Sequence, residues 1–119
     1  MIKKHNRSFN VCWDITSKCN ECCLFCYRNL EDCDLPLNEN FLIFKNLVNN
    51  GAVKISFTGG EALLYRPLFE LAKMGKDYCS RVSLSLTTNG LLLAKWDEEK
   101  QNFVPNKEYI EKIAEYFDW

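Results

Sequence analysis

The segment FNVCWDITSKCNECCLFCYRN, residues 9–29, joins a strand-like pattern to a cluster of cysteines. Apolar residues recur at every second position of residues 9–15, which predicts a β-strand. The cysteines follow at once, with four of them in the eight residues from Cys19 to Cys26. The sequence therefore predicts a strand that leads directly into a loop rich in thiols.

A helix and a second strand are predicted after this loop. Asn38 is expected to cap the N-terminus of the helix and Gly51 to end it, with apolar residues spaced along one face between them. Residues 53–57, VKISF, are typical of a short strand, and the glycine pair Gly59-Gly60 follows them.

A third unit repeats this order. Pro67 suits the first turn of a helix, and residues 81–87 return as a strand that Asn89-Gly90 ends. Residues 95–105 are polar and aperiodic, so we expect a surface loop there. A final helix begins near Asn106, and its apolar face is predicted to consist of the following residues: Ile110, Ile113, Ala114 and Phe117.

Strands that alternate with helices indicate an α/β fold with a parallel sheet and right-handed crossovers. In such sheets, functional groups gather in the loops at the carboxyl ends of the strands. The cysteine cluster, the Gly59-Gly60-Glu61 turn and the Thr88-Asn89-Gly90 turn each come just after a predicted strand. We therefore expect all three at one edge of the sheet.

Composition narrows the class of protein. A chain of 119 residues with 47% hydrophobic residues is sufficient for one small globular domain, with residues 1–8 as a polar tail. The net charge of -1 and the lack of a long basic run argue against a nucleic-acid or membrane partner. The sequence shows neither a signal-peptide pattern nor an apolar run near the length of a membrane span, so we expect a cytoplasmic protein.

Seven cysteines in a cytoplasmic chain favour metal or redox chemistry over disulfides. Thiolates suit zinc, copper(I) and iron–sulfur clusters. Zinc is less favoured here because Cys22 and Cys23 are adjacent, whereas zinc sites usually use two separated pairs of cysteines. The remaining three, Cys12, Cys33 and Cys79, are interpreted as packing residues or partly exposed thiols.

Another interpretation of the cluster is the spacing C-x3-C-x2-C, formed by Cys19, Cys23 and Cys26. A loop with this spacing can reach three corners of a cubane [4Fe–4S] cluster, which leaves one iron open for another ligand. An open coordination position is the mark of a catalytic metal site. Cys22 is then the spare thiol.

These motifs together resemble the radical S-adenosylmethionine (SAM) superfamily. The cysteine spacing with Phe25 before its last cysteine is similar to the signature of that family. Thr58–Ala62, TGGEA, resembles its Gly-Gly-Glu-Pro motif, with Ala62 in place of proline, and Thr87–Gly90, TTNG, resembles the end of its third strand. The three motifs occur in the order of the family, each at the end of a predicted strand.

The resemblance implies a partial (β/α)6 radical SAM barrel, of which residues 9–119 would be the N-terminal half with three βα units, truncated before the fourth strand. It implies a [4Fe–4S] cluster on Cys19, Cys23 and Cys26, with SAM on the open iron. Reductive cleavage of SAM by an external electron donor would yield a 5′-deoxyadenosyl radical that abstracts hydrogen from the substrate. The residues implied in SAM binding are Phe25, Gly59, Gly60, Glu61, Thr88 and Asn89.

Two further expectations concern how much of the family's barrel the chain covers and which branch of the family it resembles. A sheet of three parallel strands leaves an exposed edge, so we expect the chain to be a fragment of a longer enzyme. The motifs look most like the branch with peptide maturases and sulfatase-activating enzymes, which implies a peptide or protein as a possible substrate. Activating enzymes for glycyl radical proteins and enzymes of cofactor synthesis are other branches that the motifs leave open. The alternative to an enzyme is a non-catalytic module that binds an iron–sulfur cluster or zinc.

Overall fold

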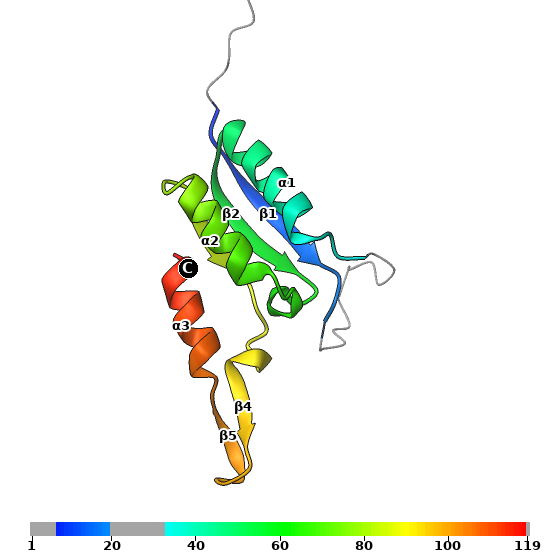
Figure 1. Ribbon diagram of the computed structural model, residues 1–119, viewed down its shortest axis with the longest axis vertical. Coiled ribbons are helices and arrows are strands. Elements are labelled where there is room, and N and C mark those ends of the chain that lie inside the picture. The colour runs from blue at the N-terminus through cyan, green and yellow to red at the C-terminus, as the bar shows by residue number, and fades with distance from the viewer. Residues whose placement is uncertain (1–6, 20–32, 119) are drawn as a thin grey trace, which may run out of the picture.

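A computed structural model describes residues 7–19 and 33–118 of the chain (Figure 1). Strands β1 (Phe9–Thr16), β2 (Ala52–Gly59) and β3 (Ser83–Leu86) form a parallel sheet in the order β1-β2-β3. This arrangement confirms the predicted α/β fold and agrees with part of a radical SAM barrel.

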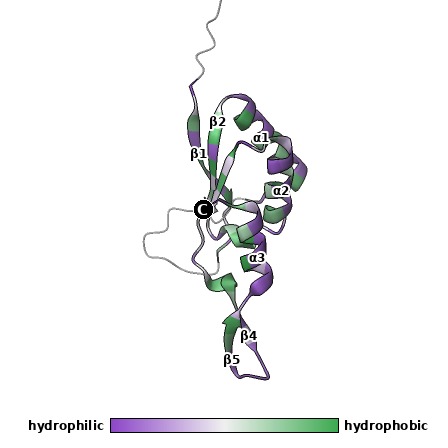
Figure 2. Ribbon diagram, turned by 90° about the vertical axis from the view of Figure 1, so that its left-hand side faces the viewer, coloured by the Kyte–Doolittle hydropathy of each residue, from purple (hydrophilic) through white to green (hydrophobic). Residues whose placement is uncertain are grey.

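Helices connect the strands and cover one face of the sheet. Helix α1 (Leu37–Asn49) follows β1, helix α2 (Leu68–Tyr78) follows β2, and helix α3 (Lys107–Tyr116) packs against α2. Two short 3-10 helices, η1 (Ala62–Leu64) and η2 (Leu91–Leu93), lie in the loops after β2 and β3. Figure 2 shows α1 and α2 together on one side of β1 and β2.

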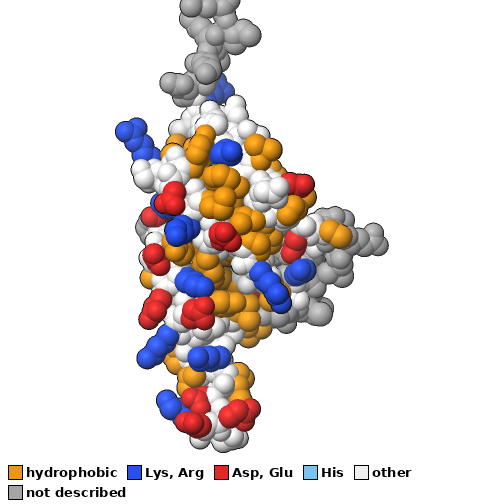
Figure 3. Space-filling view, viewed as in Figure 1, with side chains coloured by type: hydrophobic (Ala, Val, Ile, Leu, Met, Phe, Trp, Pro, Cys, Tyr) orange, Lys and Arg blue, Asp and Glu red, His pale blue; other side chains and the backbone are white. Residues whose placement is uncertain are grey.

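The core lies between the sheet and these helices. Ile55 and Phe57 of β2 and Leu84 of β3 are fully buried, and they meet Phe44 of α1 and Leu71 of α2 in one hydrophobic cluster. Side chains that face the core alternate with side chains that face away from it, because successive residues of a strand point to opposite faces of the sheet. Seen from the helical side, hydrophobic side chains also reach the surface between charged ones (Figure 3).

The start of α1 differs from the sequence prediction. Asn38 is not the N-cap, because Pro36 occupies that position with φ −67° and ψ 159°, and its carbonyl accepts the amide of Asn40. The locked φ of proline is compatible with this extended cap, and it makes Pro36 the last non-helical residue. Gly51 ends the segment as predicted, with φ +108°.

Residues 95–105 form an antiparallel hairpin rather than the predicted loop. Strands β4 (Ala94–Asp97) and β5 (Asn102–Pro105) pair Trp96 with Phe103, whose ring centroids lie 5.2 Å apart. The hairpin extends away from the sheet (Figure 1), and Phe103 is 72% exposed. Because it has no buried face, the sequence lacks the apolar alternation on which the prediction depended.

The buried face of α3 is also only partly as predicted. Ile113 and Phe117 contact the core, whereas Ala114 is exposed and Ile110 is 42% exposed. The ring of Phe69 on α2 determines which face of α3 is buried. The distance between ring centroids is 5.6 Å from Phe69 to Tyr109 and 6.3 Å from Phe69 to Phe117.

After α3 the chain turns along the edge of β3. The amide of Asp118 donates to the carbonyl of Leu84 at 2.7 Å, and the amide of Leu84 donates to Oδ2 of Asp118 at 2.8 Å. Phe117 is extended, with φ −114° and ψ 140°. The edge of β3 that we expected to be exposed is therefore paired at Leu84.

Asp118 predicts a pH dependence of stability. The Leu84 amide and then the Lys76 ammonium group, 2.9 Å from the carboxylate, hold the pKa of Asp118 below its ordinary value. A carboxyl group with a lowered pKa in the folded state stabilises the fold above the unfolded-state pKa, and this contribution is lost as the pH falls through the lower folded-state pKa. The side chain is 45% exposed, so solvent screening limits the effect.

We therefore expect Asp118→Asn to lower the free energy of unfolding at pH 7 by at most about 1 kcal/mol. The difference from the wild type should shrink as the pH falls below about 4. Urea unfolding of both proteins across this range measures it. Asp77→Asn, at an exposed position of α2, is the control. A difference that grows on acidification would contradict the prediction.

Across residues 7–19 and 33–118, no helix is both long and apolar enough to span a membrane.

Candidate functional site

The ends of the three parallel strands are joined by direct hydrogen bonds. The amide of Gly60 donates to the carbonyl of Thr16 at 2.8 Å, and the amide of Glu61 donates to the carbonyl of Lys18 at 2.7 Å. On the other side, the amide of Asn89 donates to Oε2 of Glu61 at 2.8 Å. The structure thus brings the start of the cysteine loop, the Gly-Gly-Glu turn and the turn after β3 together at one edge of the sheet.

The glycine pair is required by the chain's own backbone. A Cβ atom at Gly60 would lie closer than 3.0 Å to the carbonyl oxygens of Lys18 and Ser17, and a Cβ at Gly59 would be equally close to the carbonyl oxygen of Thr16. Gly59 also has φ +133°, which L side chains rarely adopt. The residues that approach the glycine pair so closely are those leading into the cysteine loop.

The carboxylate of Glu61 links the turns after β2 and β3. Glu61 is 1% exposed, and its Oε1 accepts the amide of Leu63 at 3.1 Å and the hydroxyl of Thr88 at 2.7 Å. Its Oε2 accepts the amide of Asn89. A buried carboxylate needs such donors because its desolvation is otherwise costly. The expected contact between Glu61 and the amino group of SAM stays a prediction.

Thr88 and Asn89 also shape the turn that they belong to. The hydroxyl of Thr88 accepts the amide of Gly90 at 3.1 Å, and Oδ1 of Asn89 accepts the amide of Leu91 at 3.0 Å. Both are local turns of the type that threonine and asparagine favour. Their expected place in the lining of the SAM pocket stays a prediction.

Of the predicted cluster ligands, the structure describes Cys19. It lies three residues after the end of β1 and is partly buried. Cys23, Cys26 and Phe25 lie outside the described residues, as does the spare Cys22. Among the residues that are described, no group of three metal-binding side chains is assembled. The ligand set therefore stays a prediction from the spacing and the family.

The other three cysteines lie apart from one another. Cys12 is exposed on β1, Cys79 packs partly against the core at the end of α2, and Cys33 is exposed where the chain returns towards α1.

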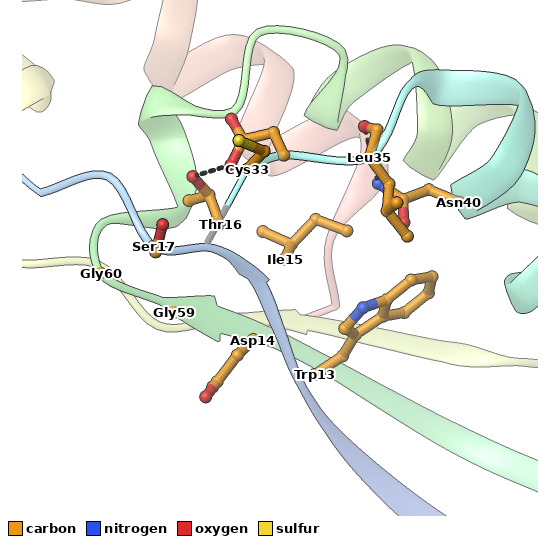
Figure 4. Close-up of a pocket in the computed structure, with 11 residues that line it drawn as sticks. Trp13, Asp14, Ile15, Thr16, Ser17, Cys33, Leu35, Asn40, Gly59 and Gly60 are labelled. Carbon is orange, nitrogen blue, oxygen red and sulfur yellow. Dashed lines mark hydrogen bonds between the residues drawn. The ribbon is translucent and has the colours of Figure 1, made fainter. Parts of the chain in front are cut away.

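Cys33 also lines a cavity of about 230 Å³ at the end of β1 (Figure 4). Ile15 and Thr16 point towards the cavity, and Asp14 points to the other side of the strand.

Polar groups that sequence analysis missed surround this cavity. Asp34 accepts the hydroxyl of Thr16 at 2.6 Å and lies 3.3 Å from Nζ of Lys18. The buried Asn40 donates from Nδ2 to the hydroxyl of Tyr65 at 2.8 Å, and burial is the main cause that raises the pKa of this tyrosine. No pattern in the sequence indicated these contacts, because Thr16 and Asp34 are 18 residues apart and Asn40 and Tyr65 are 25 residues apart.

Comparison with known proteins gives a consistent result. The model of the "Radical SAM superfamily" matches residues 13–119. The chain is 38% identical over 110 residues to a protein of Campylobacter jejuni subsp. doylei named GTP 3′,8-cyclase. The matched region is 86% of the chain and 34% of that protein.

Two further relatives carry the same name. The protein of Nautilia profundicola is 36% identical over 103 residues, which is 81% of the chain and 32% of that protein. The protein of Aliarcobacter butzleri is 32% identical over 118 residues, which is 85% of the chain and 36% of that protein. The chain spans about a third of the length of the curated relatives it matches.

Proposed function

Because this chain belongs to the radical SAM superfamily, we propose that residues 9–119 form the N-terminal part of the core domain of a radical SAM enzyme. The family implies a [4Fe–4S] cluster and SAM as cofactors. In the proposed site, Cys19, Cys23 and Cys26 hold the cluster, and the turn formed by Gly59, Gly60 and Glu61 lies beside SAM.

The observation that carries this proposal is the hydrogen bond between the amide of Glu61 and the carbonyl of Lys18. It places the residue before the first proposed cluster ligand against the turn proposed to bind SAM. SAM bound to the open iron would lie next to the cluster, so the residues that hold the cluster and those that bind SAM must also be neighbours. The thiol of Cys19 also has the soft donor chemistry that iron–sulfur clusters need.

When bound, the cluster and SAM would supply one-electron cleavage of SAM to a 5′-deoxyadenosyl radical that abstracts hydrogen from the substrate. The protein supplies position and shape. Glu61 holds the turn after β3 against the turn after β2, so Thr88 and Asn89 are fixed at the same edge as Cys19. Phe25 is proposed to lie near the adenine. The electron comes from an external donor.

We further propose that the substrate is a guanosine nucleotide. The relatives are named GTP 3′,8-cyclase, and the similarity extends over 86% of this chain. The peptide substrate expected from the sequence has no support among these relatives. A nucleotide is therefore the better candidate.

Anaerobic reconstitution with iron and sulfide tests the cofactor assignment. We expect about four irons per chain and, after reduction, an electron paramagnetic resonance spectrum that changes when SAM is added. A cubane spectrum indifferent to SAM would instead support a non-catalytic iron–sulfur module. Zinc bound at one equivalent without uptake of iron would support a zinc module.

Formation of 5′-deoxyadenosine tests the substrate class. The longer enzyme of which this chain is expected to be a part is reconstituted and incubated with SAM and dithionite, alone or with GTP, ATP or a mixture of peptides, and the product is measured by mass spectrometry. We expect GTP to raise the yield more than the other additions do. A response to peptides and not to GTP would overturn the nucleotide assignment and leave the cofactor assignment standing.

A further inference from the structure

Asp34 connects the described residues at the two ends of the predicted cysteine loop, residues 17–33. The loop leaves β1 after Thr16, and Oδ1 of Asp34 accepts the Thr16 hydroxyl at 2.6 Å where the chain returns. The other carboxylate oxygen of Asp34 lies 3.3 Å from Nζ of Lys18, on the outgoing side of the loop. Both ends are therefore held by one carboxylate, whose side chain is 16% exposed.

A bulge in β1 directs Thr16 towards Asp34. In the pairing with β2, Asp14 faces Thr58 and Thr16 faces Gly59, so β1 has one residue more than β2 in this interval. The extra residue interrupts the alternation of faces. Ile15 and Thr16 are consequently both buried, each 4% exposed, and their side chains point to the same side (Figure 4).

The hydroxyl of Thr16 is both a hydrogen-bond donor and a hydrogen-bond acceptor. It donates to Asp34 and accepts the amide of Lys18 at 3.1 Å. The carbonyl of Lys18 in turn accepts the amide of Glu61. A continuous chain of hydrogen bonds therefore runs from Asp34 through Thr16 and Lys18 to the Gly-Gly-Glu turn.

The returning end of the loop has a rigid support. The carbonyl of Leu35 accepts the hydroxyl of Tyr65 at 2.9 Å and Nδ2 of Asn40 at 3.3 Å. Asn40 and Tyr65 are 2% and 3% exposed, so these donors are fixed in the core. Asp34 is thus attached to a part of the fold that cannot move away without breaking buried hydrogen bonds.

We propose that Asp34 is a positioning residue that closes the base of the cysteine loop and so retains the iron–sulfur cluster. The inference rests on the proposed function, because it assumes that the loop carries the cluster. Residues behind the ligands of a metal set ligand orientation and typically change metal affinity by about 10–100-fold when they are replaced. Asp34 acts on the cluster through the backbone of residues 16–18.

The hydrogen bond, rather than the charge, carries this role. Lys18 is 64% exposed, and an ion pair at such a position contributes little. The bond from Thr16 is short and partly buried, and removal of its acceptor would leave the buried hydroxyl of Thr16 without this partner, which is the costly case for a hydrogen bond. Asparagine keeps an oxygen that can accept the Thr16 hydroxyl, whereas alanine does not.

Iron retention by the reconstituted chain tests the proposal. The wild type, Asp34→Asn, Asp34→Ala and Thr16→Val are reconstituted anaerobically, and iron release to an excess of a coloured chelator is followed over time. We expect release about tenfold faster from Asp34→Ala and Thr16→Val, and within about twofold of the wild type from Asp34→Asn. The variant that combines Asp34→Ala with Thr16→Val should release iron no faster than Thr16→Val alone, because Thr16→Val already removes the bond between the two side chains.

Asp77→Ala, at an exposed position of α2, is the matched control and should behave as the wild type. Thermal unfolding before reconstitution verifies that each variant is folded. Equal release from Asp34→Ala and the wild type would overturn the proposal, and so would equal loss in Asp34→Asn and Asp34→Ala. A wild-type chain that takes up no iron would contradict the proposed function and remove the basis of this inference with it.

Discussion

Gly60→Ala is expected to destabilise the fold by about 3 kcal/mol and to abolish the binding of SAM. The new Cβ would lie within 3.0 Å of the carbonyl carbon and oxygen of Lys18 and of the carbonyl oxygen of Ser17. These are backbone atoms at the start of the cysteine loop, so no flexible side chain can move aside. The turn would have to separate from the loop and break the bond between the Glu61 amide and the Lys18 carbonyl.

Such a loss is a large part of the stability of a small domain, which is usually about 5–15 kcal/mol. Urea unfolding measures the stability, and equilibrium dialysis with labelled SAM measures the binding to the reconstituted chain. The two measurements separate a damaged fold from a damaged site.

Gly90→Ala is the matched control. Gly90 has φ +82°, but a Cβ there would meet nothing within 4 Å. Its replacement should cost only the strain of a left-handed residue, about 1 kcal/mol. If the two alanine variants were equally stable, the close approach of the loop to Gly60 would not limit the fold.

The second large effect is expected at the cysteines. Cys19→Ala, Cys23→Ala and Cys26→Ala should each abolish stable cluster binding, because each removes one of the three thiolates proposed to hold it. Cys22→Ala should retain most of the iron, since Cys22 is the thiol outside the C-x3-C-x2-C spacing. Iron and acid-labile sulfide per chain after reconstitution are the measurement.

Cys12→Ala is the control for this series, because Cys12 is exposed on β1 and outside the loop. It should bind as much iron as the wild type. Loss of the cluster in Cys22→Ala together with its retention in Cys23→Ala would show that the assignment of ligands is shifted by one residue.

The fold was largely predictable because its signals are local. Apolar residues alternate along β1, and Ile55 and Phe57 do the same in β2, since one face of the sheet is buried. The prediction was wrong where that condition is absent. The β4–β5 hairpin has no buried face, and the capping of α1 depended on Pro36 rather than on the more typical Asn38.

The candidate site was predictable as a set of residue types and less so as a set of contacts. The position of Glu61 after a glycine pair and a strand marked it as functional, but its contacts with Thr88 and Asn89 bridge 27 and 28 residues of sequence. A long-range contact of this kind depends on the register between β2 and β3, and no periodicity within one segment records that register.

The sequence by itself determined the parallel α/β order, the edge where the three motifs meet and the family to which they belong, because alternation, turn residues and cysteine spacing act within a few residues. The tertiary structure decided why Gly59 and Gly60 must be glycine, what the carboxylate of Glu61 contacts and that Asp34 contacts Thr16 and Lys18. The physical reason is that a single bulge in β1 and the pairing of β2 with both β1 and β3 bring these distant groups within hydrogen-bond distance.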